Sequence, residues 1–356
     1  MMTKAATYTF STGRRVLAGL FLTAALAMAQ PGRDLLVLTS TNGSPNNLAV
    51  FKLDTSAAAA LSLVTMLPTG GNGGAPGPQA GAVQFSGELG AVTNYGSNTV
   101  SQLLRIGNSL AVTGEIRLAS NCVNPVSTAI SGSQLFVVGP TCAESHAWPW
   151  GFVDGSVVSL TDASAAQIAA GQTWAAVTLT SGSVLQLPLN GTKSLSGTST
   201  DIALPSNANM VPLGEAFWGN LLGINPAHSP DSFALINSQR QVFPVLGPQP
   251  AYPSNAPCWL AKGAGNIWYA GNSPGKAISI FFSDGQGGSF YKSVPLPGAP
   301  TDITVSADGA WLAVIYTASD GAHVGVFSVD SYGDLTLVAD SPTVGVAAFD
   351  GVAFSQ

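Results

Sequence analysis

Charged side chains are scarce in this chain of 356 residues. Asp, Glu, Lys and Arg make up 8% of it, whereas glycine alone accounts for 41 residues. Helices of soluble proteins expose many charged residues, and the helical spacing of apolar residues is almost absent here. This composition favours many short strands joined by tight turns. One segment, 163–171, could form a short helix, although it fits a small-residue strand equally well.

A long hydrophobic run is also missing. No stretch approaches the ~20 apolar residues of a membrane-spanning helix. The longest apolar run is Val16–Leu26. Three basic residues, Lys4, Arg14 and Arg15, precede it, and the small-residue pattern Ala27–Ala29 follows it. This order is typical of a secretory signal peptide. We therefore expect residues 1–29 to be removed near Gln30, by the general secretory or the twin-arginine route. The remaining domain, 30–356, is then extracytoplasmic, either periplasmic or secreted.

Basic residues are too few for a nucleic-acid partner. Removing the first 29 residues removes three basic and no acidic side chains, which takes the formal charge from −6 to −9. Binding to phosphates requires clustered Lys and Arg. We therefore expect no nucleic-acid partner and no membrane partner. The expected protein is a monomer that presents a loop face to a small-molecule or protein ligand.

One stretch, Thr301–Asp330, has a pattern that recurs in weaker copies along the chain. Apolar residues alternate on both sides of the turn at Ala307–Gly309, and a third apolar strand ends at Asp330. A fourth strand, 334–338, follows another turn that contains glycine. This spacing predicts four antiparallel strands. Such a unit cannot bury both faces alone, so it predicts one blade of a propeller.

The end of the third strand in each unit sets the number of blades. An apolar run closes on an Asp, Asn or Gly turn at seven positions, which are Asp54, Gly107, Asp162, Asn190, Asn237, Asp284 and Asp330. The last three intervals are about 46 residues, as in a four-stranded blade. The intervals around the third and fourth units are uneven. We predict an all-β fold, a seven-bladed β-propeller of four-stranded antiparallel blades.

The two ends of this domain predict how the ring closes. Residues 33–40 are similar to the second strand of a unit that has no first strand ahead of it. Residues 351–356 are similar to that missing first strand. We therefore expect the C-terminal strand to complete the first blade. This closure removes the free sheet edges of an open array.

Two of the three cysteines are placed symmetrically about a hairpin. Cys122 and Cys142 flank two predicted strands and are equidistant from the turn at residue 132. In-register pairing would put the two cysteines opposite each other, where a disulfide can form. The alternative is a pair of reduced cysteines. Cys258 is predicted to be buried and to pack as a small hydrophobic residue.

Three segments resemble a known family. Asn94–Leu110, Ala256–Gly287 and Pro300–Val338 are similar to the turn-and-strand patterns of the seven-bladed lactonase family, which includes bacterial 6-phosphogluconolactonase and fungal carboxymuconate-lactonizing enzymes. The resemblance covers the second, sixth and seventh units. It implies a ligand site at one end of the central channel. It also implies that a His, a Glu and several arginines at that site hold an acidic substrate.

The arginines that this resemblance implies are not found on the predicted ligand face. Only four arginines follow residue 29, and none lies in a loop of that face; they are Arg33, Arg105, Arg117 and Arg240. Glu215 is predicted to lie in a turn on the opposite face. Lys276 is the one strong cation predicted nearby. An acidic substrate would therefore lack the bidentate contacts that arginine provides.

The three histidines are predicted to share one face. His146, His228 and His323 each fall between a predicted second and third strand, and each has a carboxylate within three residues. A histidine oriented by a carboxylate can act as a general base or a metal ligand. Glu144 and His146 are the candidate catalytic pair, and three solvated loop histidines are the alternative. Blades two apart are too distant for a shared zinc ion, so no metal is expected.

Aromatic residues and one carboxylate complete the predicted ligand face. The loop Gly139–Gly155 contains Trp148 and Trp150, which would either stack on a ligand or fold onto their own blade. Asp302, at a connection between blades, is predicted to face the channel. A single carboxylate is a weak calcium site, so no cofactor is expected.

The sequence leaves two functions open. A non-catalytic ligand- or protein-binding module is favoured, because the predicted ligand face has aromatic and polar residues without the arginines of the lactonase family. The alternative is a hydrolase of an uncharged sugar lactone or other lactone, with His146 as the base and Glu144 orienting it. The candidate ligand-binding residues are Trp148, Trp150, His228, His323, Asp302 and Lys276.

Overall fold

A computed structural model describes residues 33–56, 59–77, 79–149, 151–204, 211–227, 233–245 and 256–356. The chain divides into Met1–Gly32 and a compact unit, Arg33–Gln356. The predicted signal peptide lies outside the described residues. Among the residues that are described, no helix is long and apolar enough to cross a membrane.

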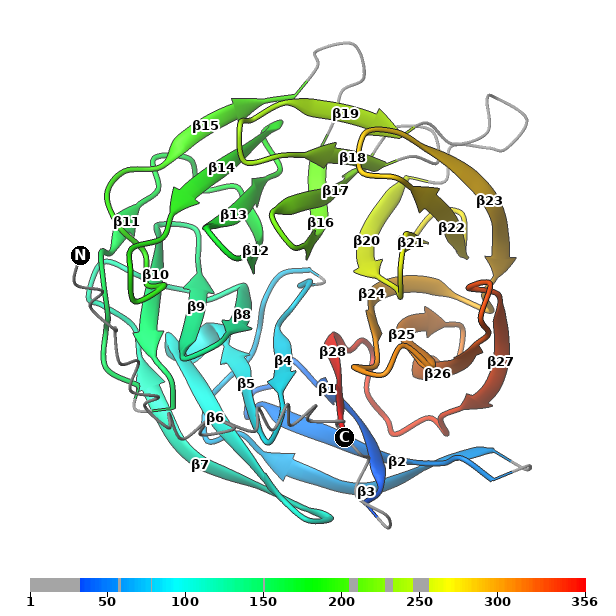
Figure 1. Cartoon of the computed structure of the whole chain (residues 1–356). Helices are drawn as coiled ribbons and strands as arrows, with labels where there is room; N and C mark the ends of the chain where they lie inside the picture. The colour runs from blue at the N-terminus through cyan, green and yellow to red at the C-terminus, as the bar shows by residue number, and fades with distance from the viewer. Residues whose placement is uncertain are drawn as a thin grey trace, which may run out of the picture. The chain divides into compact units, whose positions relative to one another are not determined.

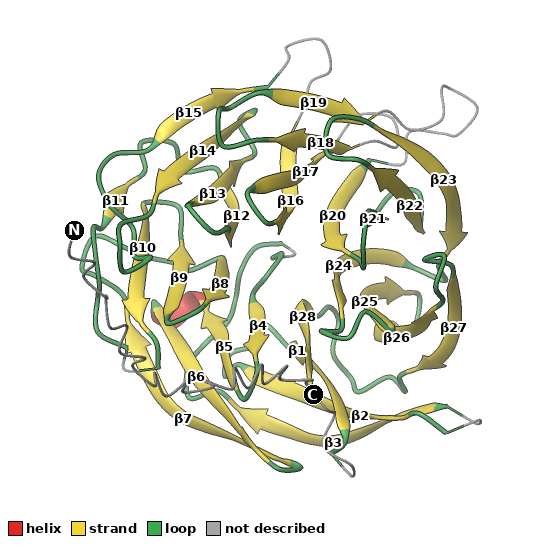
Figure 2. Ribbon diagram, in the orientation of Figure 1, coloured by secondary structure: helices red, strands yellow, loops and turns green. Residues whose placement is uncertain are grey.

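The unit Arg33–Gln356 is a ring of seven antiparallel sheets with four strands each (Figure 1). In the described residues, a single 3₁₀ turn, η1 (Tyr95–Ser97), is the one helical segment (Figure 2). The predicted all-β, seven-bladed β-propeller is therefore confirmed.

Each blade is described from the strand nearest the centre of the ring outward. The first four blades are β28 (Asp350–Ser355), β1 (Leu35–Ser40), β2 (Asn47–Asp54), β3 (Ala60–Pro68); β4 (Val83–Ser86), β5 (Leu89–Asn94), β6 (Thr99–Ile106), β7 (Ser109–Arg117); β8 (Ser127–Ser131), β9 (Gln134–Val138), β10 (Cys142–Ala147), β11 (Val158–Ser159); and β12 (Ala165–Ala170), β13 (Trp174–Leu179), β14 (Ser183–Pro188), β15 (Thr200–Ala203). The last three blades are β16 (Val211–Trp218), β17 (Leu221–Ala227), β18 (Phe233–Ile236), β19 (Val242–Val245); β20 (Pro257–Lys262), β21 (Ile267–Asn272), β22 (Ala277–Ser283), β23 (Gly288–Pro295); and β24 (Ala299–Val305), β25 (Trp311–Ala318), β26 (Gly321–Val329), β27 (Leu335–Asp340).

The core consists of hydrophobic layers between adjacent blades. The second strands β9, β13 and β21 are buried along their whole length. Neighbouring blades cover both faces of these strands, which explains why their sequences are mostly apolar and do not alternate with exposed polar residues. The fourth strands lie at the rim, and β7 alternates between exposed and partly buried residues over most of its length. Each layer therefore depends on two blades, as expected for a repeat protein.

The C-terminal strand closes the ring as predicted. Strand β28 pairs antiparallel with β1, and Leu36 lies opposite Ser355. The buried guanidinium of Arg105 in β6 holds this junction, because it donates to the carbonyl oxygens of Ser355 (2.7 Å), Gly107 (2.8 Å) and Asp34. Burial lowers the pKa of Arg105 to about 10. One side chain of the second blade thus joins both ends of the first.

The third blade differs from its prediction. Its third strand, β10, ends at Ala147, whereas the sequence analysis placed that end at Asp162. The missed strand reads CAESHA, which is polar and yet buried. Its Ser145 hydroxyl accepts a hydrogen bond from the amide of Leu195 (3.0 Å), so the polar side chains have partners inside the fold. A search for apolar strands does not find a strand of this kind. The ambiguous segment 163–171 contains β12, a strand.

Candidate functional site: the central channel

The inner strands present one side chain per blade at a shared position. In five blades a β-bulge interrupts the pairing of the inner strand, and the residues that follow it are Gln167 in β12, Glu215 in β16, Trp259 in β20, Asp302 in β24 and Val352 in β28. A bulge bends its strand and redirects the next side chain. We call these five the bulge residues.

Two bulge residues bond to the inner strand of the next blade. The amide group of Gln167 donates to the carbonyl oxygen of Glu215 (3.1 Å) and accepts from its backbone N–H (2.8 Å). The indole N–H of Trp259 donates to the carbonyl oxygen of Pro300 (2.7 Å). These bonds satisfy backbone groups at the inner edge of a sheet, which would otherwise be buried without partners.

A third bulge residue, Asp302, joins three blades. Its Oδ2 accepts from the backbone N–H groups of Gly81 (3.2 Å) and Val352 (3.1 Å), and its Oδ1 accepts from Ile303 (2.9 Å). The side chain is buried, and burial raises its pKa to about 7 even though the three amides favour the charged form. Asp302 therefore lies at the channel, and both of its carboxylate oxygens already accept hydrogen bonds from backbone donors.

The segment just before β4 forms the floor of the channel. The amide of Gln79 donates to Asp350 in β28 (3.3 Å), and the carbonyl oxygen of Gly81 accepts from the amide of Thr128 in β8 (2.9 Å). Figure 1 shows this light-blue segment reaching the middle of the ring. Burial, together with the charge of Asp302, raises the pKa of Asp350 to about 7. The floor is therefore held on carboxylates of the first and seventh blades.

Glu215 is the exception among the bulge residues. It is 2% exposed, and no described group meets hydrogen-bond distance and angle at either carboxylate oxygen, although the backbone amide of Ala169 makes a weaker contact. Burial raises its pKa well above the ordinary value, while the nearby amide of Ala169 acts in the opposite direction. The preceding Gly214 is required, because a Cβ there would lie 2.6 Å from the backbone nitrogen of Leu260 in β20. The prediction that Glu215 lies in a turn is wrong, because the residue lies within β16.

A cavity of about 250 Å³ lies in the channel above the floor. Its polar lining residues are Glu215, Asp302, Gln167, Gln84, Thr304 and Lys262, and its apolar ones include Ile168, Leu260, Ile303 and Val305. We call this space the channel cavity. Sequence analysis missed Gln167 and Glu215 as site residues. The signal was present, since both are polar residues at matching positions in successive first strands.

Lys262 lines the channel cavity, but its charge is directed elsewhere. Its Nζ donates to the carbonyl oxygens of Gly263 and Gly265, both at 2.7 Å. It also lies over the rings of Trp218 (5.0 Å) and Trp268 (5.3 Å). Burial lowers its pKa to about 8. The ammonium group therefore has partners of its own and forms no ion pair with Glu215.

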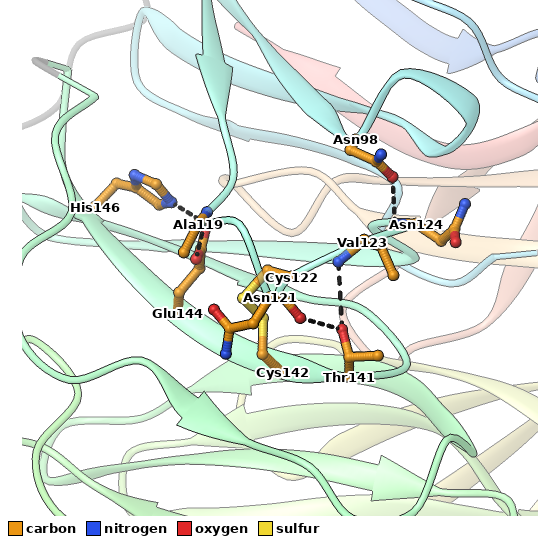
Figure 3. Close-up of a disulfide and its surroundings, with 10 residues drawn as sticks. All are labelled: Asn98, Ala119, Asn121, Cys122, Val123, Asn124, Thr141, Cys142, Glu144 and His146. Atoms are coloured by element: carbon orange, nitrogen blue, oxygen red, sulfur yellow. Dashed lines mark hydrogen bonds and ion pairs between the residues drawn. A yellow bond between two sulfur atoms is a disulfide. The ribbon is translucent and has the colours of Figure 1, made fainter.

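The predicted catalytic pair is buried inside the third blade (Figure 3). Glu144 and His146 lie in β10 and not in a loop, and neither is exposed. The ring of His146 contacts Glu144 Oε1 through Nε2 (2.8 Å) and the carbonyl oxygen of Gly151 through Nδ1 (3.0 Å). Glu144 Oε2 accepts from the amide of Ala119 (3.1 Å). A catalytic role stays a prediction, and the burial argues against it, because a base must reach the proton that it removes.

A disulfide lies beside this pair. Cys122 and Cys142 are bonded, with their Cα atoms 5.3 Å apart (Figure 3). Together with Glu144 they are the one cluster of three metal-ligand side chains in the part of the chain that the structure describes. Sulfur atoms joined in a disulfide are not thiolates and cannot bind a metal as thiolates do. The cluster therefore does not indicate a metal site.

The aromatic loop of the third blade was assigned to the wrong connection. The residues after β10 join the third and fourth strands, whereas the prediction placed them between the second and third. Trp148 is 5% exposed and packs with Ile116 and Leu135 between the second and third blades. Of the two alternatives, the structure shows the folded-down one for this residue. Trp150 lies outside the described residues.

The remaining predicted ligand residues do not gather at the channel cavity. His323 lies in β26 and not in a loop, where its ring stacks on Tyr316 and contacts Asp320 (3.0 Å) and the carbonyl oxygen of Ser341 (3.2 Å). Lys276 is exposed at the turn between β21 and β22. His228 lies outside the described residues. Of the predicted set, Asp302 is the one described residue that lines the channel cavity.

Comparisons with known proteins bear on the fold alone. No family model and no curated protein matches the chain. A protein of unknown function from Desulfotomaculum acetoxidans matches with a TM-score of 0.67 at 13% identity, over 90% of this chain and 99% of its own. A protein from Lactobacillus plantarum gives a TM-score of 0.67 at 14% identity, over 91% and 99%. Virginiamycin B lyase from Staphylococcus aureus gives 0.60 at 15% identity, over 79% and 92%. The chain therefore shares the propeller fold of these proteins, while membership of the lactonase family stays a prediction.

Proposed function

We propose that this protein is a ligand-binding propeller whose site is the channel cavity. The observation that carries the proposal is Glu215. Of the four bulge residues with polar side-chain atoms, the other three each bond to the next blade, and Glu215 bonds to none. A buried carboxyl group without a partner costs free energy, which a ligand that supplies hydrogen-bond donors would offset. Polar groups that converge in a mainly preformed cavity are typical of small-molecule sites.

Binding is favoured over lactone hydrolysis. The lining residues of the channel cavity that the structure describes include no histidine, and His146 is enclosed in the third blade. The oxygens of Asp302 are occupied by backbone donors, which leaves Glu215 as the one free carboxyl. General acid–base hydrolysis ordinarily uses two groups that both reach the substrate.

We also propose that the protein acts outside the cytoplasm. The charge and hydropathy pattern of residues 1–29 supports export, and the disulfide supports an oxidising compartment. The chain has few basic residues, which supports a partner other than nucleic acid.

A ligand screen tests the proposal. Residues 30–356, purified from an oxidising compartment, would be melted with a panel of small sugars, amino acids, amines, carboxylic acids and lactones. We expect one chemical class to raise the melting temperature, and Glu215→Gln to abolish that shift. If none of the compounds raises the melting temperature, the result contradicts the proposal. Lactone turnover that is lost in His146→Ala, without a lower melting temperature, would favour the hydrolase instead.

A further inference from the structure

We propose that the channel cavity binds a small organic cation, an alkylammonium with a short aliphatic body, through the carboxylate of Glu215. This inference rests on the proposed binding function and names its ligand class.

The channel brings three buried carboxyl groups together. Glu215, Asp302 and Asp350 come from the inner strands of three blades and are 2%, 6% and 4% exposed. No ion pair joins any of the three to a Lys, Arg or His of the described residues. Buried carboxylates ordinarily have a cationic partner or a full set of donors. A cation in the channel would favour the ionised forms of these groups, whose pKa values are raised by burial, and would then be attracted by them.

Glu215 is the carboxylate that is left for a ligand. Asp302 receives three backbone N–H groups, and Asp350 receives the amide of Gln79. Both of these residues hold the floor and the ring closure. Glu215 lines the cavity, and its carboxyl has no well-formed hydrogen bond within the described residues, only the weaker contact from the amide of Ala169. An ammonium group would supply up to three donors and the missing charge.

The one cation beside the cavity is not its partner. The ammonium of Lys262 is held by two carbonyl oxygens and two indole rings at the end of β20. If the Lys262 side chain moved to pair with Glu215, it would lose all four of these contacts. An external cation leaves them intact.

The space fits an organic cation better than a metal ion. Calcium takes about six to eight oxygen ligands. Across the described residues, however, the channel carboxylates are not part of any group of three ligand atoms within 4.8 Å of one another. The cavity of about 250 Å³ is far larger than one ion and lies just below the range of about 300–1,000 Å³ typical of drug-sized ligands. Ile168, Leu260 and Ile303 in its lining would contact a short aliphatic chain.

Calorimetric titration tests the proposal with defined probes. Wild-type protein, residues 30–356, would be titrated with n-butylammonium chloride, 1,4-diaminobutane, 1-butanol and calcium chloride. We expect both amines to bind with one site, and 1-butanol to bind at least tenfold more weakly than n-butylammonium. Glu215→Gln should weaken amine binding at least tenfold. Glu88→Gln is the matched control, because the Glu88 side chain is 63% exposed and is not one of the lining residues.

The outcomes separate this inference from the proposed function. Equal binding of 1-butanol and n-butylammonium would overturn the cation while leaving a binding cavity. Calcium binding without amine binding would also overturn it, in favour of a metal site. If no probe binds and no compound of the melting-temperature screen stabilises the protein, both proposals fail. The comparison of butylammonium with butanol uses wild-type protein, so it holds even if Glu215→Gln does not fold.

Discussion

Single polar side chains join the blades of this protein at its centre. Gln167, Trp259 and Asp302 each bond to the backbone of the next inner strand, where a β-sheet would otherwise end in unpaired groups. Such bonds fix the position of one blade against the next, because a buried donor or acceptor that loses its partner costs about 1–3 kcal/mol. Glu215 occupies the same position without such a bond, so stability does not explain its presence.

Replacing Glu215 should therefore stabilise the ligand-free protein. At pH 8 the unfolded chain carries an ionised Glu215, and folding must either bury that charge without a partner or take up a proton, because burial raises its pKa. We expect Glu215→Gln to raise the free energy of unfolding by about 1–3 kcal/mol, since the neutral amide avoids this penalty. Urea unfolding at pH 8 measures the change. Glu88→Gln should stay within about 0.5 kcal/mol of wild type. A loss of stability in Glu215→Gln would show that the carboxyl makes a favourable contact.

The floor carboxylates should make stability depend on pH. The pKa values of Asp302 and Asp350 are raised from 3.8 to about 7 in the folded protein, so the folded state holds protons that the unfolded state has lost. Their stabilising contribution is complete below about pH 4 and is lost as the pH rises to about 7. Urea unfolding at pH 5 and pH 7.5 should give the lower free energy at pH 7.5.

Asp302→Asn provides the control for this pH dependence. The variant should lower stability at both pH values, because its amide nitrogen would face the N–H donors of Gly81 and Val352. The difference between pH 5 and pH 7.5 should nevertheless shrink. An unchanged difference would show that other groups cause the dependence.

At the scale of single strands, the spacing of apolar residues predicted the fold, whereas strands with buried polar residues were placed wrongly. Strands such as β21 and β25 are apolar and alternate with glycine turns, so their number and order followed from the sequence. Strand β10 was not predicted because it contains the buried polar residues Glu144 and His146. These two side chains contact each other, and a pattern of hydropathy does not reveal such a pair. Glu215 was misplaced because a bulge keeps the strand going through Gly214, where the residue pair alone suggested a turn.

The disulfide should stabilise the third blade. It closes a loop of 20 residues between Cys122 and Cys142. Loops of this length predict a contribution of about 2–4 kcal/mol. We expect the double variant Cys122→Ser with Cys142→Ser to lose that amount in urea unfolding. Cys258→Ser serves as the control, because Cys258 is free. Equal loss in both variants would contradict a specific role for the disulfide.

For the whole molecule, the first blade is the point where the ring is closed. Its inner strand, β28, comes from the far end of the domain, and Arg105 of the second blade holds the carbonyl oxygens on both sides of the junction. The planar guanidinium reaches three oxygens at once, which a lysine cannot do. The ring therefore depends on one buried arginine as well as on strand pairing.

Arg105→Ala should weaken the closure strongly. The buried carbonyl oxygen of Ser355 and the partly buried ones of Asp34 and Gly107 would lose a charged donor, so we expect a loss of about 3 kcal/mol in the free energy of unfolding. Arg105→Lys should recover only part of it. Hydrogen exchange should show faster exchange in β1 and β28 than in the other blades. Arg117→Ala, at an exposed position, is the control and should leave both measurements unchanged.

The pairing of β28 with β1 also sets the order in which the protein can finish folding. Strands β1 to β3 are synthesised first, yet their sheet keeps an open edge until residues 350–355 have been made. An open edge can pair with a strand of another chain. Aggregation should therefore compete with folding mainly during this interval, and a chaperone that shields the first blade would raise the yield.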